Sequence, residues 1–134
     1  SHKGNVYWNN VLIATLAPND YNVHTFTQTV AAVAGTNTLS FIGVGTSDGY
    51  GLGIDNVQLI RSGTYDNVVV NGGFERPAQN GGWNVYPGIE GWTSGQIEIG
   101  NGKIYNSQWT SQICELNVRI NDKISQSFNF GNSW

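Results

Sequence analysis

Short runs in which apolar and polar residues alternate recur along the whole chain, and no stretch has the apolar spacing of an amphipathic helix. Asn, Gly, Asp and Ser separate these runs, as is typical of turns between strands. The alternation therefore predicts an all-β fold, with strands at residues 6–8, 11–16, 24–30, 38–44, 54–60, 68–70, 92–93, 96–99, 112–117 and 123–130.

The first two of these runs predict a β-hairpin. Asn9 and Asn10 stand between them, and two successive Asn residues readily adopt the positive φ angles of a tight primed turn. The Gly-rich residues 45–53 predict a loop and not a phosphate site. A phosphate loop opens a helix, whereas a strand is expected to follow here.

Composition limits the size of the fold and its partners. The 134 residues fit one domain with a single core, so we expect residues 1–134 to form one β-sandwich. Only 11% of the residues are charged and the net charge is -3, which argues against nucleic acid or an anionic membrane as a partner. Five Trp, six Tyr, eighteen Gly and no Met are typical of short strands and tight turns, and favour an extracellular or cell-surface location.

The titratable residues do not suggest a catalytic site. General acid and base catalysis needs two carboxylates in one cleft, but Glu90, Glu98 and Glu115 belong to different turns and strands. A Ser-His-Asp triad would need His24, and no Gly-x-Ser-x-Gly motif accompanies it. The single cysteine, Cys114, lies in an apolar strand and is expected to be a buried structural thiol. We therefore predict that the chain is not an enzyme.

Several motifs of the chain resemble galactose-binding-like jelly-roll modules. Residues 71–77 (NGGFERP), 82–83 (GW), 87–92 (PGIEGW), 97–100 (IEIG), 114–116 (CEL) and 124–128 (ISQSF) resemble the first half of such a module. Residues 6–10 (VYWNN), 45–48 (GTSD) and 54–59 (IDNVQL) resemble its second half. The family includes carbohydrate-binding modules of bacterial secreted proteins and plant cell-wall proteins of undefined role. The resemblance implies a jelly-roll β-sandwich.

The two halves stand in exchanged order. Residues 1–60 resemble the second half of the module and residues 67–130 the first half, with residues 61–66 between them. This order indicates a circularly permuted sandwich or a window cut across a repeat. In both cases the closing strand at residues 53–59 should lie near the opening strand at residues 67–77.

The resembling modules have a further core strand, for which this chain shows no counterpart. If that strand is absent, a sheet would leave backbone groups unpaired above an apolar groove, and a partner could donate a strand to it. The alternative is that strand lengths have changed and the sandwich closes without help.

The resemblance also implies a structural calcium ion. Its ligands would be Glu75, Asp55 and the carbonyl oxygen of Gly73, because oxygen donors in loose geometry suit this hard cation. The alternative is that both carboxylates are satisfied by hydrogen bonds at strand ends.

Aromatic residues with polar neighbours supply candidates for a sugar site. A sugar ring stacks on aromatic side chains while amides bind its hydroxyls. The candidates are Tyr86, Tyr105, Trp109 and Tyr50, and each could instead pack in the interior, as is expected of Trp8 and Trp92.

Two functional classes follow from these observations. One is a non-catalytic extracellular module that binds a glycan or polysaccharide, or mediates adhesion. The other is a structural subunit of an extracellular filament or surface layer, in which identical subunits assemble through strand donation or sheet edges.

Overall fold

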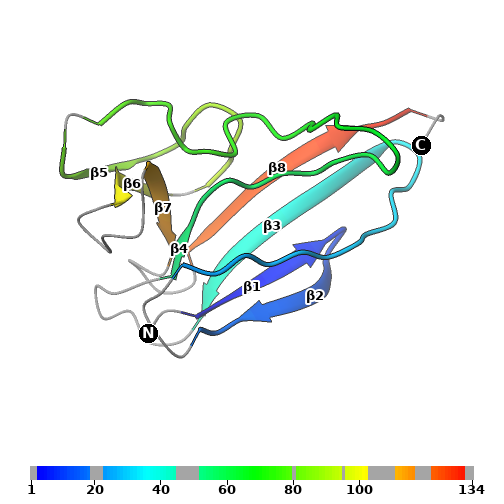
Figure 1. Ribbon diagram of the computed structural model, residues 1–134, viewed down its shortest axis with the longest axis horizontal. Helices are drawn as coiled ribbons and strands as arrows, with labels where there is room; N and C mark the ends of the chain where they lie inside the picture. The colour runs from blue at the N-terminus through cyan, green and yellow to red at the C-terminus, as the bar shows by residue number, and fades with distance from the viewer. Residues whose placement is uncertain are drawn as a thin grey trace.

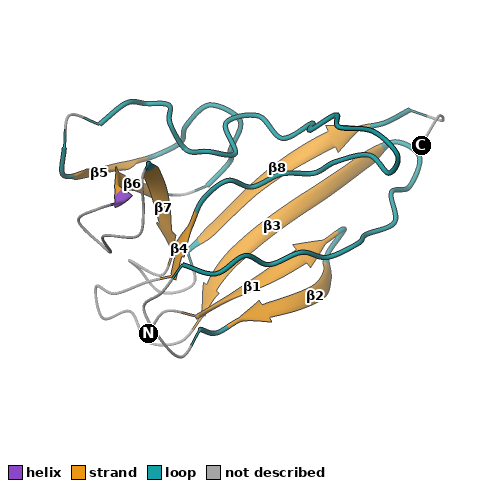
Figure 2. Cartoon of the chain, viewed as in Figure 1, coloured by secondary structure: helices purple, strands orange, loops and turns teal. Residues whose placement is uncertain are grey.

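The computed structural model describes residues 3–18, 23–44, 52–79, 81–94, 96–102, 111–116 and 122–131. These residues form two antiparallel four-stranded sheets and contain no α-helix (Figures 1 and 2). The prediction of an all-β chain is confirmed, and the two sheets have the character of a β-sandwich. No helix in the described part of the chain is both apolar enough and long enough to span a bilayer.

The first sheet has the strand order β2-β1-β3-β8. Its strands are β1 (Lys3–Trp8), β2 (Val11–Leu16), β3 (Thr36–Val44) and β8 (Lys123–Asn129). Asn9 and Asn10 have φ angles of 52° and 65°, so they form the predicted tight turn between β1 and β2. The predicted hairpin is confirmed, with Trp8 opposite Val11.

The second sheet has the strand order β4-β7-β6-β5. Its strands are β4 (Leu52–Ile54), β5 (Trp83–Tyr86), β6 (Ile97–Asn101) and β7 (Gln112–Leu116). Strand β5 was not predicted, because its residues read as a loop in the sequence. It lies at the edge of the sheet and pairs only with β6 in the described chain.

Both sheets contribute to one hydrophobic core. Trp92 joins the first sheet to the loop that carries Phe74, because its ring centroid lies 6.2 Å from that of Phe41 on β3 and 5.4 Å from that of Phe74, on which it stacks. The buried core residues are Val6, Trp8, Leu39, Phe41, Leu52, Ile54, Phe74, Trp92, Ile97, Ile99, Cys114, Leu116, Ile124, Phe128 and Phe130.

Four predicted strands are absent or much shorter than expected. Residues 92–93 form only isolated bridges, to Ile89 and Ser125. Residues 24–30 are irregular, because no strand of the described chain pairs with residues 25–30. Strand β4 ends at Ile54, and the positive φ of Asn56 (51°) prevents its regular continuation. Residues 68–70 form no strand, since only the bridge between Ile60 and Asn67 joins this region to residues 55–60.

The predicted closing and opening segments nevertheless lie side by side. The backbone amide of Val57 donates to the carbonyl of Gly72 at 2.9 Å, and that of Val68 donates to Leu59 at 3.0 Å. A Cβ atom on residue 72 would lie 2.1 Å from the Val57 carbonyl oxygen, so only glycine fits this approach. The predicted proximity of the two segments is confirmed, while the permuted jelly-roll topology stays a prediction.

We expect Phe74→Ala to destabilise the fold more than any exposed aromatic substitution. Phe74 has no exposed surface, so its truncation leaves a cavity beside Trp92 and should cost about 3–5 kcal/mol of unfolding free energy. Urea denaturation measures this cost. Tyr65→Ala is the matched control, because Tyr65 is fully exposed and its loss should change stability by less than about 0.5 kcal/mol. Equal costs for the two variants would contradict the assigned core.

Candidate functional site

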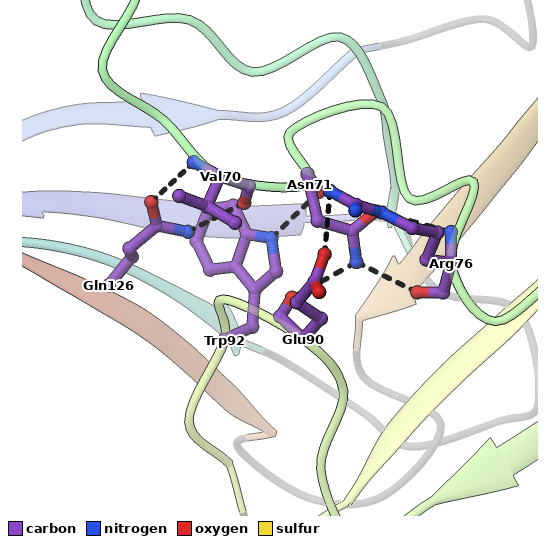
Figure 3. Close-up of polar contacts among 6 residues, drawn as sticks. All are labelled: Val70, Asn71, Arg76, Glu90, Trp92 and Gln126. Atoms are coloured by element: carbon purple, nitrogen blue, oxygen red, sulfur yellow. Dashed lines mark hydrogen bonds and ion pairs between the residues drawn. The ribbon is translucent and has the colours of Figure 1, made fainter.

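The loop that carries Glu75 is held by the side chain of Asn71. Its amide donates to the carbonyl oxygens of Arg76 (2.7 Å) and Glu90 (3.0 Å), and its Oδ1 accepts from the Arg76 backbone amide at 3.2 Å (Figure 3). An ion pair of 2.6 Å joins the side chains of Arg76 and Glu90, but both are more than half exposed, so it adds little stability. Asn71 therefore fixes the turn that presents Glu75.

Two buried side chains hold the preceding backbone against the core. Gln126 on β8 accepts from the Val70 amide at 2.7 Å and donates to the Val70 carbonyl at 2.9 Å, as a neighbouring strand would do. The Trp92 indole donates to the carbonyl of Asn71 at 2.9 Å (Figure 3). These three hydrogen bonds anchor residues 70–71 to the core.

The structure brings Asp55 and Glu75 together, as the calcium prediction requires. They are held by successive residues at the start of β7. The Ser111 hydroxyl donates to Asp55 Oδ2 at 2.7 Å, and the Gln112 backbone amide donates to Glu75 Oε2 at 3.0 Å. The Gln112 side chain also donates to the carbonyl of Phe74 at 2.7 Å, which ties the Glu75 loop to β7.

Burial disfavours the charge on both carboxylates. It raises the pKa of Asp55 above its ordinary value, while the Ser111 hydroxyl and the Asn56 backbone amide lower it. Burial also raises the pKa of Glu75. The Gln112 amide opposes this shift, and the negative charge of Asp55 adds to it. The pair therefore forms a locus of negative charge that a cation would stabilise.

One carboxylate oxygen at this locus lacks a partner. Asp55 Oδ1 is buried and accepts no hydrogen bond from the described residues. Gly73 lies beside Glu75, since a Cβ on residue 73 would approach Glu75 Cγ to 3.7 Å. An orphaned carboxylate oxygen, a second carboxylate and a neighbouring backbone turn fit an oxygen-binding cation. The described residues contain no group of three or more His, Cys, Asp or Glu that could hold a metal, so backbone oxygens or water would have to complete the coordination.

Only one of the four predicted sugar-binding residues lies in the described chain. Tyr86 is half-buried at the end of β5, and its hydroxyl accepts from Gln79 Nε2 at 2.6 Å. Tyr50, Tyr105 and Trp109 lie outside the described residues. The ring that the sequence analysis did not select is Trp83, which is 56% exposed on the edge strand β5. The alternation of β5 could have indicated it only if that strand had been recognised.

A second pair of carboxylates was missed by the sequence analysis. Glu98 on β6 stands directly opposite Glu115 on β7, and both are buried. Each has polar or electrostatic partners of its own. Cys114 is the neighbour of Glu115 on β7 and stands opposite Ile99 on β6, and it is fully buried as predicted. Burial raises the pKa of this thiol, and Glu98, Asp122 and Glu115 raise it further, so a nucleophilic thiolate is strongly disfavoured.

Comparisons with known proteins do not add an identity. No family model, no curated protein sequence and no solved structure matches the chain.

The raised pKa values give the metal-free protein a defined pH dependence. The folded state keeps a proton on Asp55 that the unfolded chain releases near pH 3.8. The free energy of unfolding should therefore fall as the pH rises from about 4 through the raised folded-state pKa, and then level off. Urea denaturation in excess chelator measures this. Asp55→Asn should show a smaller fall, whereas Asp66→Asn, at an exposed turn, should behave as the wild type. An identical fall in both variants would contradict the assignment to Asp55.

Proposed function

We propose that this chain is a non-catalytic, extracellular β-sandwich module that binds carbohydrate or mediates adhesion. The observation that carries the proposal is the exposed edge strand β5, which combines the aromatic ring of Trp83 with the amide of Asn84, hydrogen-bonded to the amide of Gln79. Its partner would be a glycan or polysaccharide at a cell surface. The buried, deactivated thiol of Cys114 supports a binding role over covalent catalysis.

The amides of Asn84 and of the neighbouring Gln79 are held in fixed orientations. Asn84 Nδ2 donates to Gln79 Oε1 at 2.7 Å, and Gln79 Nε2 donates to the Tyr86 hydroxyl at 2.6 Å. The Gln79 backbone amide also donates to the side-chain oxygen of Gln112. Such a network places donors and acceptors before a ligand arrives, which lowers the entropic cost of binding hydroxyl groups.

The aromatic ring of the same strand is available for stacking. Trp83 and Val85 point to the face opposite Asn84 and Tyr86, because side chains alternate along a strand. Both are exposed, Trp83 by 56% and Val85 by 39%. A glycan that stacks on Trp83 would have to cross the edge of β5 to reach the amide of Asn84 on the other face, and the strand would then offer it the two kinds of contact that carbohydrate recognition uses.

We further propose that Asp55, Glu75 and the carbonyl of Gly73 bind a structural calcium ion. The orphaned Oδ1 of Asp55 supports this assignment. A bound cation would offset the partial burial of Asp55 and its repulsion with the exposed Glu75 where residues 55–60 meet residues 67–75. Its role would be to stabilise this junction, and not to take part in chemistry.

Calcium should raise the thermal stability of the wild-type protein. At a calcium concentration 100 times Kd, binding stabilises the folded state by about 2.7 kcal/mol, so excess chelator should lower Tm by several degrees. Differential scanning calorimetry measures the shift. Asp55→Asn should make Tm insensitive to both calcium and chelator. A wild-type Tm that chelator leaves unchanged would sink the calcium proposal.

Trp83→Ala should weaken carbohydrate binding about two- to tenfold, because one aromatic stacking contact contributes about 0.5–1.5 kcal/mol. The measurement is retention on immobilised cellulose, xylan, galactan and mannan, followed by calorimetry with soluble fragments. Tyr65→Ala is the control, since Tyr65 is an exposed ring in the turn at residues 61–66, away from β5 (Figure 1). Trp109→Ala tests the sequence-based candidate in the same assay. Absence of binding to every polysaccharide would refute the proposal.

The alternative function is that of a structural subunit of an extracellular fibre or layer. A groove lined by residues 23–30 favours this alternative, because residues 25–30 pair with no strand of the described chain.

A further inference from the structure

Strand β2 is an edge of the first sheet. In the described chain it pairs only with β1, at one end of the strand order β2-β1-β3-β8, and it forms one margin of the sheet in Figure 1. An edge strand presents backbone donors and acceptors that can pair with another chain. The hydrogen bonds of its neighbour β1 determine which groups of β2 are open.

The backbone groups of β1 face its two neighbours in alternation. The amide of Asn9, just after β1, donates to the Thr38 carbonyl of β3 at 2.9 Å. In an antiparallel pair, every second residue bonds to the same neighbour. Since the register between β1 and β3 is regular, the backbone groups of Tyr7 and Asn5 also face β3.

This alternation leaves two residues of β2 with open backbone groups. Leu12 stands opposite Tyr7, and Thr15 stands opposite Asn5. Because Tyr7 and Asn5 bond to β3, the backbone amides and carbonyls of Leu12 and Thr15 face away from β1. These backbone groups have no hydrogen-bond partner in the described chain. The outer edge of β2 thus offers two donors and two acceptors.

The side chains of β2 do not protect this edge. Lysine and proline are common guards of an edge strand, but residues 11–16 (VLIATL) contain no charged residue and no proline. Val11 is 63% exposed and Leu12 is 51% exposed. Ile13 is bulged, since it has no partner in the register with β1, but the open groups lie on both sides of it. A strand added here would bury aliphatic surface and would meet no charge.

The opposite edge of the same sheet, β8, is occupied. Ser125 exchanges two backbone hydrogen bonds with Thr93, at 2.9 and 3.0 Å. The neighbouring Gln126 side chain holds the backbone of Val70. A copy that added its β2 to β8 would have to displace Thr93, so an open chain of copies through the first sheet is blocked. A contact between β2 and β2 needs no such displacement.

We propose that β2 pairs antiparallel with β2 of a second copy of this chain, about a twofold axis perpendicular to the first sheet. Leu12 of each copy then stands opposite Thr15 of the other, and each of these pairs exchanges two backbone hydrogen bonds. The bulge at Ile13 gives both copies the same spacing between Leu12 and Thr15. One twofold operation therefore forms both pairs and closes the assembly at a dimer.

The second copy would lie beside the first, because a twofold axis perpendicular to the sheet extends the sheet in its own plane. Val11 lies on the core side of β2, since it stands opposite the buried Trp8, and Leu16 packs against the core. In the dimer Val11 would approach Leu16 of the second copy, because each is one residue beyond the Leu12–Thr15 pair. The exposed Val11 would then gain an apolar neighbour.

The β2 contact rests on the assembly alternative proposed above and is independent of carbohydrate binding, because β5 belongs to the other sheet. The contact is short. Two strands of six residues bury less than the about 1,200 Å² of an ordinary stable interface. We therefore expect a weak dimer, whose population rises from micromolar to millimolar protein.

The test is analytical ultracentrifugation of the wild-type chain over this range, without polysaccharide, with hydrogen exchange measured at both ends of it. We expect a monomer–dimer equilibrium, with the amides of Leu12 and Thr15 protected only in the dimer. Thr15→Pro should weaken the dimer at least about tenfold, because it removes one donor from each copy. The monomer should keep its fold, since this amide is not bonded to β1 and proline is tolerated on an edge strand.

Thr15→Ala is the matched control. Both variants lose the hydroxyl that donates to Asn5 at 2.8 Å, but alanine keeps the backbone amide, so this variant should dimerise as the wild type does. Leu12→Lys makes the same test should Thr15→Pro fail to fold, because a lysine guards the edge and should also weaken the dimer at least about tenfold.

A wild-type chain that stays monomeric at every concentration overturns the inference. So does a dimer that neither variant weakens, or one in which the protected amides lie outside β2. Polymers larger than a dimer overturn the closed contact and support the fibre alternative. Retention of the wild type and of Thr15→Pro on polysaccharide separates failure of the β2 contact from failure of carbohydrate binding.

Discussion

The close approach of Gly72 to the carbonyl of Val57 is the constraint on which the rest of the structure depends. It joins the end of one half of the chain to the beginning of the other, through the hydrogen bond from the Val57 amide to the Gly72 carbonyl. Asn71 and Phe74, with φ angles of 54°, turn the backbone on either side of the contact. These turns direct Phe74 onto Trp92, so the packing of the core and the path of the junction are set together.

The same contact positions the candidate metal site. Asp55 precedes Val57 on one segment and Glu75 follows Gly72 on the other, so the approach of the two backbones forces two carboxylates into one region. Ser111 and Gln112 reach both of them from β7, which couples the second sheet to the junction. The burial that disfavours their charge is a cost of this arrangement, and a cation is the kind of ligand that removes it.

Turns could be predicted from the sequence where neighbouring residues alone determine the backbone angles. The Asn9–Asn10 turn fixes the β1–β2 hairpin through backbone angles that few other pairs adopt. The proximity of Asp55 and Glu75 was expected from the resemblance of residues 54–59 and 71–77 to the closing and opening strands of a jelly-roll module. Pairing between strands that are distant in the sequence was harder to predict. Nothing local indicates that Glu98 stands opposite Glu115, or that the short strand β5 finds β6, because register depends on the whole sheet.

The error at residues 24–30 has a different cause. Their alternation of Thr with Phe, Gln and Val is that of a strand, and the structure keeps them free of positive φ angles. A strand, however, is defined by its neighbour as much as by its own residues, since its backbone groups must be paired across a gap. Here the space beside the segment is a groove over the core and not another strand. The sequence pattern therefore describes the conformation that the segment is suited to, whereas strand formation also requires a neighbouring strand, which the described chain does not place beside residues 25–30.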